Sequence, residues 1–406
     1  MLTIELIENL ARLNRTKIPE QTIHAKGAGA HGIFIPYMSM RDYTKAGFLQ
    51  DPNIETPVFV RFSRMMGRAG SADTVRDVRG FSVKFYTGDG IYDLCGIHFP
   101  VFFIRDPNKY PALLEALSPC PKTNIRNPER LWSFAAENRE TMHMLTWLYS
   151  DRGTIKSYRN MEGHSVHTYV WENNKGEHFW VRYHWKPLQG VKDINRQEAE
   201  FLAGYDPDAA ARDLAVTLDE GGKISYELCV QIIPTKQKTE NEAHLLDPVC
   251  IWPESLVPIV RAGKMILLRG VENYHEEVEK ACFCLGNLVP GIKLSHEPLL
   301  LAMTFACRDE HRYRLGVEGP QIHFRDTDDG LGSINSRADS FYSGSVNNDQ
   351  LALRLQSMSK QDKEKMIDNM VEDMLFIDED IQKKIVGYFG EADNAVGTSL
   401  EKWLGL

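Results

Sequence analysis

One predicted helix carries three side chains whose types could hold an iron cofactor. The stretch from Met303 to Gly316, MTFACRDEHRYRLG, places Cys307, His311 and Arg314 at i, i+4 and i+7, which is one face of a helix. A thiolate is a soft donor that binds iron, and histidine and arginine can hold carboxylates at the edge of an anionic cofactor. The spacing alone favours ordinary packing, because cysteines on helices usually pack and histidine–arginine pairs are common on surfaces.

A second region of the sequence favours cofactor binding over simple packing of Cys307. His24 lies in the small-residue segment QTIHAKGAGAHGIFIP, and VFVRFSRMMGRAGSADTVRDVRGFSVKFYTGDGIYDL follows it. Here the chain closely resembles the haem catalases, and the resemblance runs over residues 17–325. The segments that carry it are HAKGAGA, PVFVRFS, GSADTVRDVRGFSVKFYT, PVFFIRDP, HRYRLG and NLVPGI.

The resemblance implies an α+β fold, a catalase-like eight-stranded antiparallel β-barrel with a wrapping segment and a C-terminal helical domain. We therefore expect an N-terminal helix or arm over residues 1–16, the haem-binding barrel core with its wrapping segment over 17–325, and a C-terminal helical region over 326–406. The implied cofactor is haem b (iron protoporphyrin IX), deep in the barrel, with the helix of Cys307 on its proximal side.

The same resemblance assigns roles to individual residues. His24 matches the distal acid–base histidine of the family, and Ser63 matches the serine that hydrogen-bonds to that histidine. The remaining matches face the cofactor: Arg61, His311 and Arg314 for the haem propionates, Phe102 for an aromatic ring against the haem, and Tyr110 at the position of a distal-channel phenylalanine.

Four positions depart from the family pattern. Cys307 stands where the family has its proximal tyrosinate, the iron ligand, and Met303 replaces the arginine one turn earlier. On the distal side, Ile97 replaces the asparagine that orients peroxide, and Gln21 replaces an arginine before the histidine segment. A buried phenolate needs a neighbouring cation, whereas iron itself keeps a bound thiol deprotonated. Loss of the arginine therefore agrees with Cys307 as the metal ligand; the alternative is that Cys307 only packs.

These departures predict a change of chemistry. An axial thiolate favours O–O cleavage, and Ile97 makes the pocket more apolar, which suits an organic substrate. The first hypothesis is a haem-thiolate oxidoreductase that uses hydrogen peroxide or an organic hydroperoxide to oxidise or rearrange a small molecule, with His24 moving protons. The alternatives are a catalase or peroxidase that decomposes hydrogen peroxide, and a haem-binding sensor or carrier without turnover. The sequence leaves the organic substrate and the oxidant open, dioxygen with a reductase included.

The composition of the chain limits its possible binding partners and its cellular compartment. The 406 residues carry a formal net charge of −9 without blocks of like charge, which argues against nucleic acid as a partner. The N-terminus lacks the pattern of a signal peptide, and no window is apolar enough for a membrane span. Seven scattered cysteines do not form a disulfide framework, so we expect a cytoplasmic protein. The family is oligomeric, and the short N-terminal arm favours a homodimer over a tetramer.

The spacing of apolar residues predicts the helices and strands that would position these side chains. Helices are expected over residues 2–13, 111–150, 196–220, 271–283 and from 349 to the end. Strands are expected in TPVFVRFSR, GFSVKFYT, FPVFFIRD, HSVHTYVWE, EHFWVRYHWK and ISYELCVQIIP, with a hairpin turn at residues 88–90. The tail contains a possible capping box at Ser359–Asp362 and a stripe of Met366, Met370 and Met374, which we expect in the core.

Other polar candidates carry less weight. His98 could point into the pocket or outward, and Cys95 is expected to pack although it could approach the distal side. His164 and His167 have the spacing of a metal pair, but their segment is predicted to be a strand. Pocket shape also depends on Met65 and Met66. Some family members bind a nicotinamide cofactor near this region, and no residue here is matched to that site.

Overall fold

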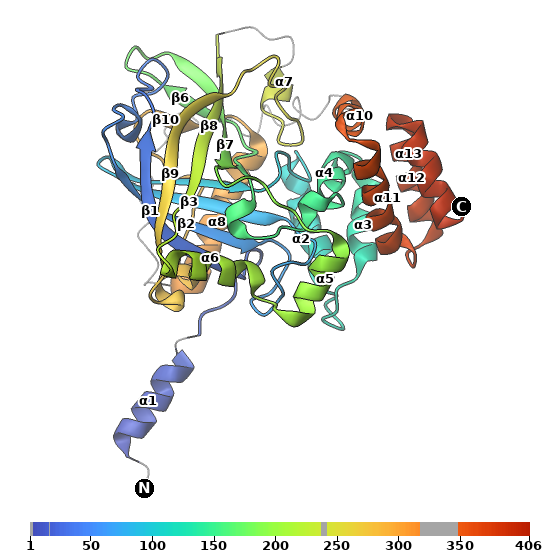
Figure 1. The fold of residues 1–406 in the computed structure, drawn as a ribbon, viewed down its shortest axis with the longest axis horizontal. Helices are drawn as coiled ribbons and strands as arrows, with labels where there is room; N and C mark the ends of the chain where they lie inside the picture. Colours follow the sequence, from blue (N-terminus) through green and yellow to red (C-terminus); the bar gives the residue numbers. More distant parts are fainter. Residues whose placement is uncertain (1–2, 16, 237–241, 317–347) are drawn as a thin grey trace.

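The barrel at the centre of the molecule is built from one antiparallel sheet that closes on itself (Figure 1). The structure is a computed structural model and describes residues 3–15, 17–236, 242–316 and 348–406. The strands of the described chain are β1 (Gly27–Pro36), β2 (Thr56–Arg64), β3 (Arg79–Thr87), β4 (Gly90–Ile97), β5 (Gly163–His164), β6 (Tyr169–Glu172), β7 (His178–Pro187), β8 (Ile224–Pro234), β9 (Val260–Gly270) and β10 (Ile292–Leu294).

Pairing of β7 with β8 closes the ring β7-β5-β4-β3-β2-β1-β9-β8, which has eight strands as predicted. The short strands β5 and β6 both pair with β7, and β10 extends the sheet beyond β6. The inward side chains are mostly aromatic: Phe62, Phe81, Phe85, Trp185 and Tyr226 are at most 2% exposed. Phe81 and Trp185 stack at 5.9 Å between ring centroids, so this part of the barrel is a packed core.

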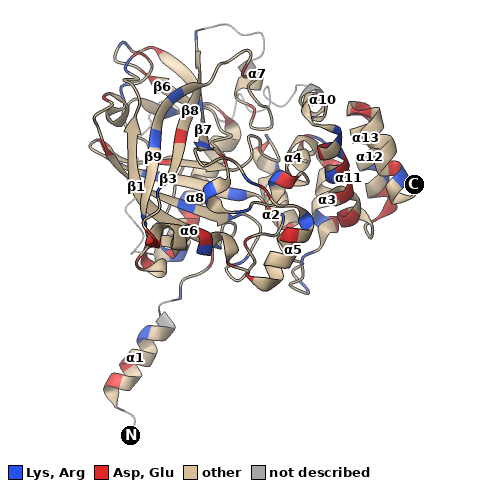
Figure 2. Cartoon of the chain, viewed as in Figure 1, with Lys and Arg blue, Asp and Glu red and all other residues tan. Residues whose placement is uncertain are grey.

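Helices lie outside the barrel, and the last four form a group beside α3 and α4 (Figure 1). They are α1 (Ile4–Arg15), α2 (Tyr110–Leu117), α3 (Pro128–Glu137), α4 (Thr141–Leu148), α5 (Arg196–Tyr205), α6 (Ala209–Asp219), α7 (Glu242–Leu245), α8 (Pro298–Leu315), α10 (Asn348–Ser357), α11 (Lys360–Met374), α12 (Glu379–Ala392) and α13 (Asn394–Leu404). Both acidic and basic residues lie along α11 (Figure 2).

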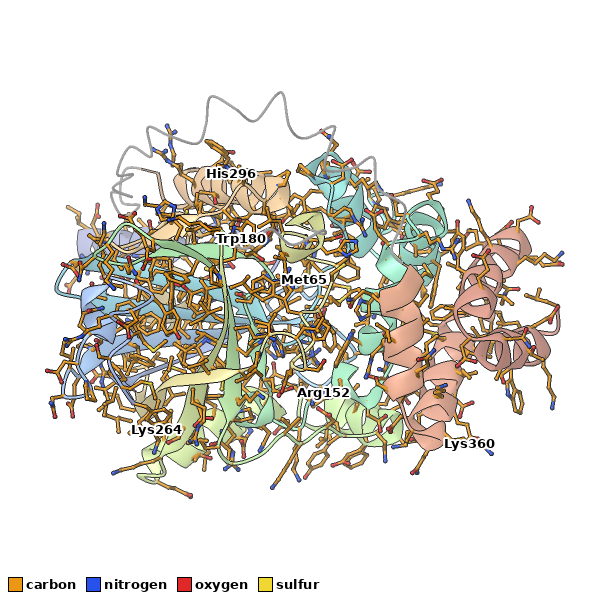
Figure 3. All side chains as sticks on the ribbon, turned by 90° about the horizontal axis from the view of Figure 1, so that it is seen from above. Met65, Arg152, Trp180, Lys264, His296 and Lys360 are labelled. Carbon is orange, nitrogen blue, oxygen red and sulfur yellow. The ribbon has the colours of Figure 1, made fainter. Side chains whose placement is uncertain are left out.

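The helical group has its own apolar core. Met366, Met370 and Met374 are each 0% exposed, which confirms the stripe as core. Ser359 caps α11, because its hydroxyl accepts the N–H of Asp362 at 3.1 Å. Met65, which follows β2, belongs to the same apolar cluster and lies near the middle of the molecule, toward the helices (Figure 3).

Helix α1 projects from the rest of the chain (Figure 1). It confirms the helix predicted over residues 2–13, and its apolar side chains Leu6, Leu10 and Leu13 are 45%, 50% and 66% exposed. No helix in the ranges that the structure describes is long and apolar enough to cross a membrane. The predicted boundary between residues 325 and 326 lies outside the described residues.

Several predictions of elements were wrong. FPVFFIRD is an irregular segment, although Phe99, Val101 and Ile104 are each 0% exposed. The helix expected over 271–283 is a single π-turn, η5 (His275–Glu279). Strands β1, β9 and β10 were not predicted at all. An apolar run that is buried in an irregular loop has the same local pattern as a strand, so only tertiary contacts distinguish the two.

Candidate functional site

A cavity of about 220 Å³ opens where the barrel meets α8 and α2. Of the nine residues that the sequence proposed for the site, eight line this cavity: His24, Arg61, Ser63, Ile97, Phe102, Tyr110, Cys307 and His311. Side chains from β2, β4, α2 and α8 thus meet with residues 21–24, which precede β1. The walls are mainly apolar, with Met65, Leu114, Phe283, Leu285 and Met303 among them.

His24 is held in an uncommon backbone conformation at the edge of the cavity. Its φ is +63°, in the left-handed region, where a residue other than glycine is strained. Its N–H donates to the Met65 carbonyl at 3.2 Å, and its Nδ1 lies 2.9 Å from Ser63 Oγ. Burial, followed by the charge of Arg61, lowers the pKa of His24 to about 4, so the ring is neutral near pH 7.

Gly80 on β3 makes room for this histidine. A Cβ at Gly80 would lie 2.3 Å from Ser63 Oγ and 2.8 Å from His24 Nδ1. Gly80 pairs with Ser63 across β2 and β3, so the register of the barrel brings the smallest residue beside the His24–Ser63 contact. The glycine is required here for close approach rather than for its backbone freedom.

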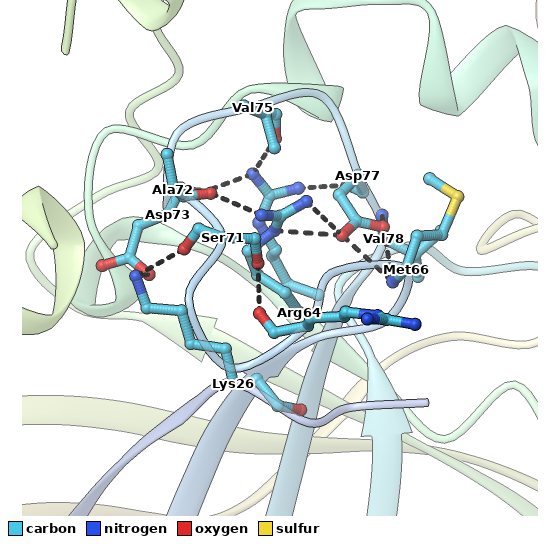
Figure 4. Close-up of polar contacts among 12 residues, drawn as sticks. Lys26, Arg64, Met66, Ser71, Ala72, Asp73, Val75, Asp77 and Val78 are labelled. Atoms are coloured by element: carbon cyan, nitrogen blue, oxygen red, sulfur yellow. Dashed lines mark hydrogen bonds and ion pairs between the residues drawn. The ribbon is translucent and has the colours of Figure 1, made fainter. Parts of the chain in front are cut away.

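A polar network supports the loop behind His24 (Figure 4). Lys26, two residues after His24, forms an ion pair with Asp73 at 3.0 Å and donates to the Ser71 carbonyl at 2.7 Å. Arg64 pairs with Asp77 at 2.9 Å, and the Asp77 carboxylate also accepts the N–H of Met66. These charges are almost fully buried and paired, so breaking one partner would leave an uncompensated charge.

Arg61 reaches the cavity from β2 and ties two segments together. Its Nη2 donates to the His24 carbonyl at 2.8 Å, and its Nε donates to the Val278 carbonyl at 3.2 Å. Burial lowers the pKa of Arg61 to about 10, which leaves the guanidinium charged near pH 7. A Cβ at Gly27 would lie 2.7 Å from this guanidinium, so the glycine-rich start of β1 is fitted to the arginine.

Cys307 enters the cavity from the middle of α8, next to a second thiol. Its Sγ lies 3.2 Å from Cys284 Sγ and 3.4 Å from the Thr304 carbonyl oxygen. The S–H that Cys307 directs at Cys284, together with burial, raises the pKa of Cys307, and the same contact lowers the pKa of Cys284. Met303, one turn earlier on α8, also lines the cavity. Sequence reasoning missed Cys284 as a neighbour of Cys307, because nothing local relates residues 23 apart.

Of four other residues predicted for the site, three line the cavity and one, Arg314, does not. Phe102, Tyr110 and Ile97 line the cavity, and Ile97 supplies an apolar side chain. Burial raises the pKa of Tyr110, so its hydroxyl stays protonated. Arg314 is not among the lining residues; its guanidinium donates to the carbonyls of Pro19 and Glu279 at 2.8 and 2.9 Å.

The open question about His98 is answered by its hydrogen bonds. His98 Nδ1 accepts the N–H of Arg79 at 2.9 Å, and Nε2 lies 3.0 Å from the Arg152 carbonyl, so the ring is structural. Cys95, which was expected to pack, also lines the cavity. Met65 lines the cavity too, and Met65 and Met66 both line an adjoining hollow beside residues 117–121.

His164 and His167 do not form a pair. His164 Nδ1 lies 2.8 Å from Nδ1 of His184, whereas His167 Nδ1 lies 2.5 Å from Glu297 Oε1. Among the described residues, no three His, Cys, Asp or Glu side chains are arranged to hold a metal ion.

The residues present suit an apolar cofactor with an anionic edge. The walls are apolar, and Arg61 supplies a buried positive charge. Within the described residues, His311 Nδ1 is buried without a hydrogen-bond partner, while its Nε2 lies 2.9 Å from the Phe283 carbonyl. A carboxylate beside Nδ1 would favour the protonated ring, which donates from both nitrogens. Arg61 and His311 would hold the carboxylates, and Cys307 would be the sulfur donor in the cavity.

Comparisons with known proteins identify relatives of this chain. Residues 1–350 match the family model described as catalase. The chain is 46% identical over 320 residues to Catalase-2 of Bacillus subtilis (strain 168), and 45% identical over 316 residues to a catalase of Methanosarcina barkeri. Each match covers 78% of this chain, but only 46% and 63% of the respective relative. The chain thus spans about half to two thirds of the length of these relatives.

Solved structures show the same architecture. A bacterial catalase superposes with a TM-score of 0.90 at 29% identity, and the match covers 100% of this chain and 90% of that chain. A fungal catalase gives 0.87 at 31% identity and is covered over 92% of its chain.

Proposed function

This chain belongs to the catalase family, and on that premise we propose that it is a haem enzyme that decomposes hydrogen peroxide. Haem b is the cofactor of the family, and its iron supplies the centre at which the O–O bond of peroxide is cleaved. The identity to catalases over 78% of the chain supports this activity over the haem-thiolate oxidation that the sequence first suggested.

The observation that carries the proposal is the contact between His24 Nδ1 and Ser63 Oγ within the cavity. In the tautomer that donates from Nδ1 to Ser63, Nε2 has a free lone pair. His24 is neutral near pH 7 because burial lowers its pKa, so Nε2 can accept a proton from one peroxide oxygen and return it to the other. Arg61 holds the His24 carbonyl and thereby fixes the histidine backbone.

A second candidate function is peroxide-driven oxidation of a small organic molecule. It is favoured by Cys307 in the cavity and by Ile97, which provides no hydrogen-bond donor to orient a second peroxide molecule. A thiolate ligand pushes electron density toward iron, and apolar walls favour an organic substrate.

Two measurements on the haem-loaded protein separate the candidates. Oxygen evolution from hydrogen peroxide, measured with an oxygen electrode, is expected if the protein decomposes peroxide. The spectrum of the ferrous carbon monoxide complex reports whether sulfur binds iron, and Cys307→Ser is the matched variant. Tight haem binding without oxygen evolution, combined with oxidation of an added organic peroxidase substrate, would overturn the first candidate in favour of the second.

A further inference from the structure

The two neighbouring thiols at α8 differ in their access to the cavity. Cys307 lines the cavity, whereas Cys284 is 1% exposed and lies between Phe283 and Leu285, whose side chains do line it. Both thiols contact the Thr304 carbonyl oxygen, Cys307 at 3.4 Å and Cys284 at 3.8 Å. The contact between the sulfurs lowers the pKa of Cys284 and raises that of Cys307, which favours Cys284 as the more readily ionised thiol. Access favours Cys307 instead, because a small solute in the cavity meets Cys307 first and Cys284 is buried behind it.

The segment that carries Cys284 is fixed to the barrel. The Asp93 carboxylate on β4 accepts the N–H of Cys284 at 3.0 Å and the side-chain amide of Asn287 at 2.7 Å. Asp93 is 0% exposed and pairs with Lys84 at 2.5 Å. Cys307 is held just as firmly, because it lies in the interior of an 18-residue helix. The backbones of the two cysteines are thus held by separate elements.

We propose that Cys284 and Cys307 form a reversible disulfide, with Cys307 as the thiol that peroxide attacks and Cys284 as the resolving thiol. Their sulfurs lie 3.2 Å apart, and a shift of about 1 Å brings them to the bond length of a disulfide. This arrangement, an oxidant-accessible thiol beside a buried partner, is the one that captures a sulfenic acid before it is oxidised further.

The reaction balances with hydrogen peroxide as oxidant. The Cys307 sulfur bonds to one peroxide oxygen, the O–O bond breaks, and the other oxygen leaves as water, which leaves a sulfenic acid on Cys307. The Cys284 sulfur then attacks the Cys307 sulfur, the S–S bond forms, and the hydroxyl leaves as water with the proton of the Cys284 thiol. Two thiols lose two electrons, and one peroxide becomes two water molecules. A dithiol reductant reverses the bond by exchange.

The consequence for the cofactor rests on the proposed function. If Cys307 is the iron ligand, the disulfide consumes the sulfur that binds iron, and peroxide in excess would release the cofactor from its protein ligand. The thiol pair itself depends only on the contacts of Cys284 and Cys307 and stands without that assumption.

Peptide mapping tests the disulfide. The reduced full-length protein is exposed to hydrogen peroxide, remaining thiols are alkylated, and the digest is analysed by mass spectrometry without reductant. A peptide joining Cys284 to Cys307 is expected, with free thiols falling from seven to five per chain and dithiothreitol restoring them. Cys284 recovered as a free, alkylated thiol under these conditions would overturn the proposal.

Matched variants assign the roles of the two thiols. In Cys284→Ser, Cys307 should proceed to sulfinic or sulfonic acid, since no resolving thiol is present. Cys282→Ser should give the wild-type cross-link, because the Cys282 thiol contacts the Lys280 carbonyl instead. A cross-link without haem binding would refute the haem function alone, whereas a thiolate–haem spectrum without any cross-link would refute only the disulfide. If Cys284→Ser does not fold, the peptide map of the wild-type protein still shows whether the Cys284–Cys307 disulfide forms.

Discussion

The two sides of the cavity differ in the interactions that hold their side chains in place. The histidine side, formed by His24, Ser63 and Gly80, is positioned by hydrogen bonds, a close glycine contact and a buried ionic network behind it. The thiol side, formed by Met303 and Cys307 with Cys284 behind them, has soft and apolar atoms, and the two sulfurs lie 3.2 Å apart.

The difference shows which part of the site tolerates change. Each residue of the histidine side touches several others, so a substitution there disturbs more than one contact. On the thiol side, Met303 and Cys307 stand at positions where the resemblance to the family implies an arginine and a tyrosine. We therefore expect a substitution on the thiol side to disturb fewer contacts than a substitution on the histidine side.

His24→Gln should have the largest effect, because it removes the proton acceptor of the histidine side. Oxygen evolution from peroxide by the haem-loaded enzyme is expected to fall roughly 10²- to 10⁴-fold, the usual contribution of an acid–base group. His31→Gln is the control, since His31 lies on the neighbouring strand β1 and pairs with Glu277 at 2.5 Å, outside the cavity. Equal rates in the two variants would show that the histidine side does not determine turnover.

Gly80→Ala tests the crowding on the same side without removing any functional group. The new methyl group would lie 2.3 Å from Ser63 Oγ, so His24 or Ser63 must move. We expect oxygen evolution to fall roughly tenfold or more and the free energy of unfolding to fall by about 1–3 kcal/mol. Gly88→Ala is the matched control, because no atom lies within 4 Å of its Cβ position. A fully active Gly80→Ala enzyme would mean that the glycine is not needed for close approach.

Acid should lower the free energy of unfolding through the buried, neutral ring of His24. The pKa of His24 is lowered to about 4 in the folded protein, whereas the unfolded chain binds the proton near pH 6.5. Below pH 6.5 the unfolded state therefore holds more protons, and the free energy of unfolding falls as pH drops from about 6.5 to about 4. Urea unfolding across this range measures the slope, and His24→Gln should reduce it. An unchanged slope in the variant would contradict the lowered pKa.

Ile97→Asn should have the smallest effect and the opposite sign. It restores an amide donor in the cavity, which contributes about 0.5–1.5 kcal/mol per hydrogen bond. Oxygen evolution is expected to rise roughly two- to tenfold, provided that the thiol side supports peroxide decomposition. Ile91→Asn on the same strand is the control, because Ile91 is 47% exposed and outside the cavity. A fall in rate with Ile97→Asn would favour the organic-substrate candidate.

Sequence patterns predicted the strands with strong alternation and the helices with clear periodicity. They missed β1, because its start, GAGAHG, has little strand propensity, and its strand conformation depends on pairing with β2 and β9 on both sides. They also missed β9, whose apolar residues are interrupted by Gly263 and Lys264. In both cases tertiary pairing outweighs local preference.

The site was predicted unevenly for a related reason. His24, Ser63 and Cys307 could be found through a family motif, because each lies in a contiguous segment. Gly80 lies in such a segment too, but its role depends on the register between β2 and β3. Cys284 follows from no local pattern, since its relation to Cys307 arises only when the segment after η5 folds against α8.

The buried methionine stripe of the helical group also affects how the protein resists oxidation. Thioethers are oxidised to polar sulfoxides, which disrupt apolar cores. Met366, Met370 and Met374 are sealed from solvent, so an oxidant that diffuses around the protein reaches them only when the helices open. Met38, which is 51% exposed, would be damaged first and at little structural cost. The rate of oxidative inactivation would then depend on local unfolding of these helices rather than on oxidation of exposed side chains.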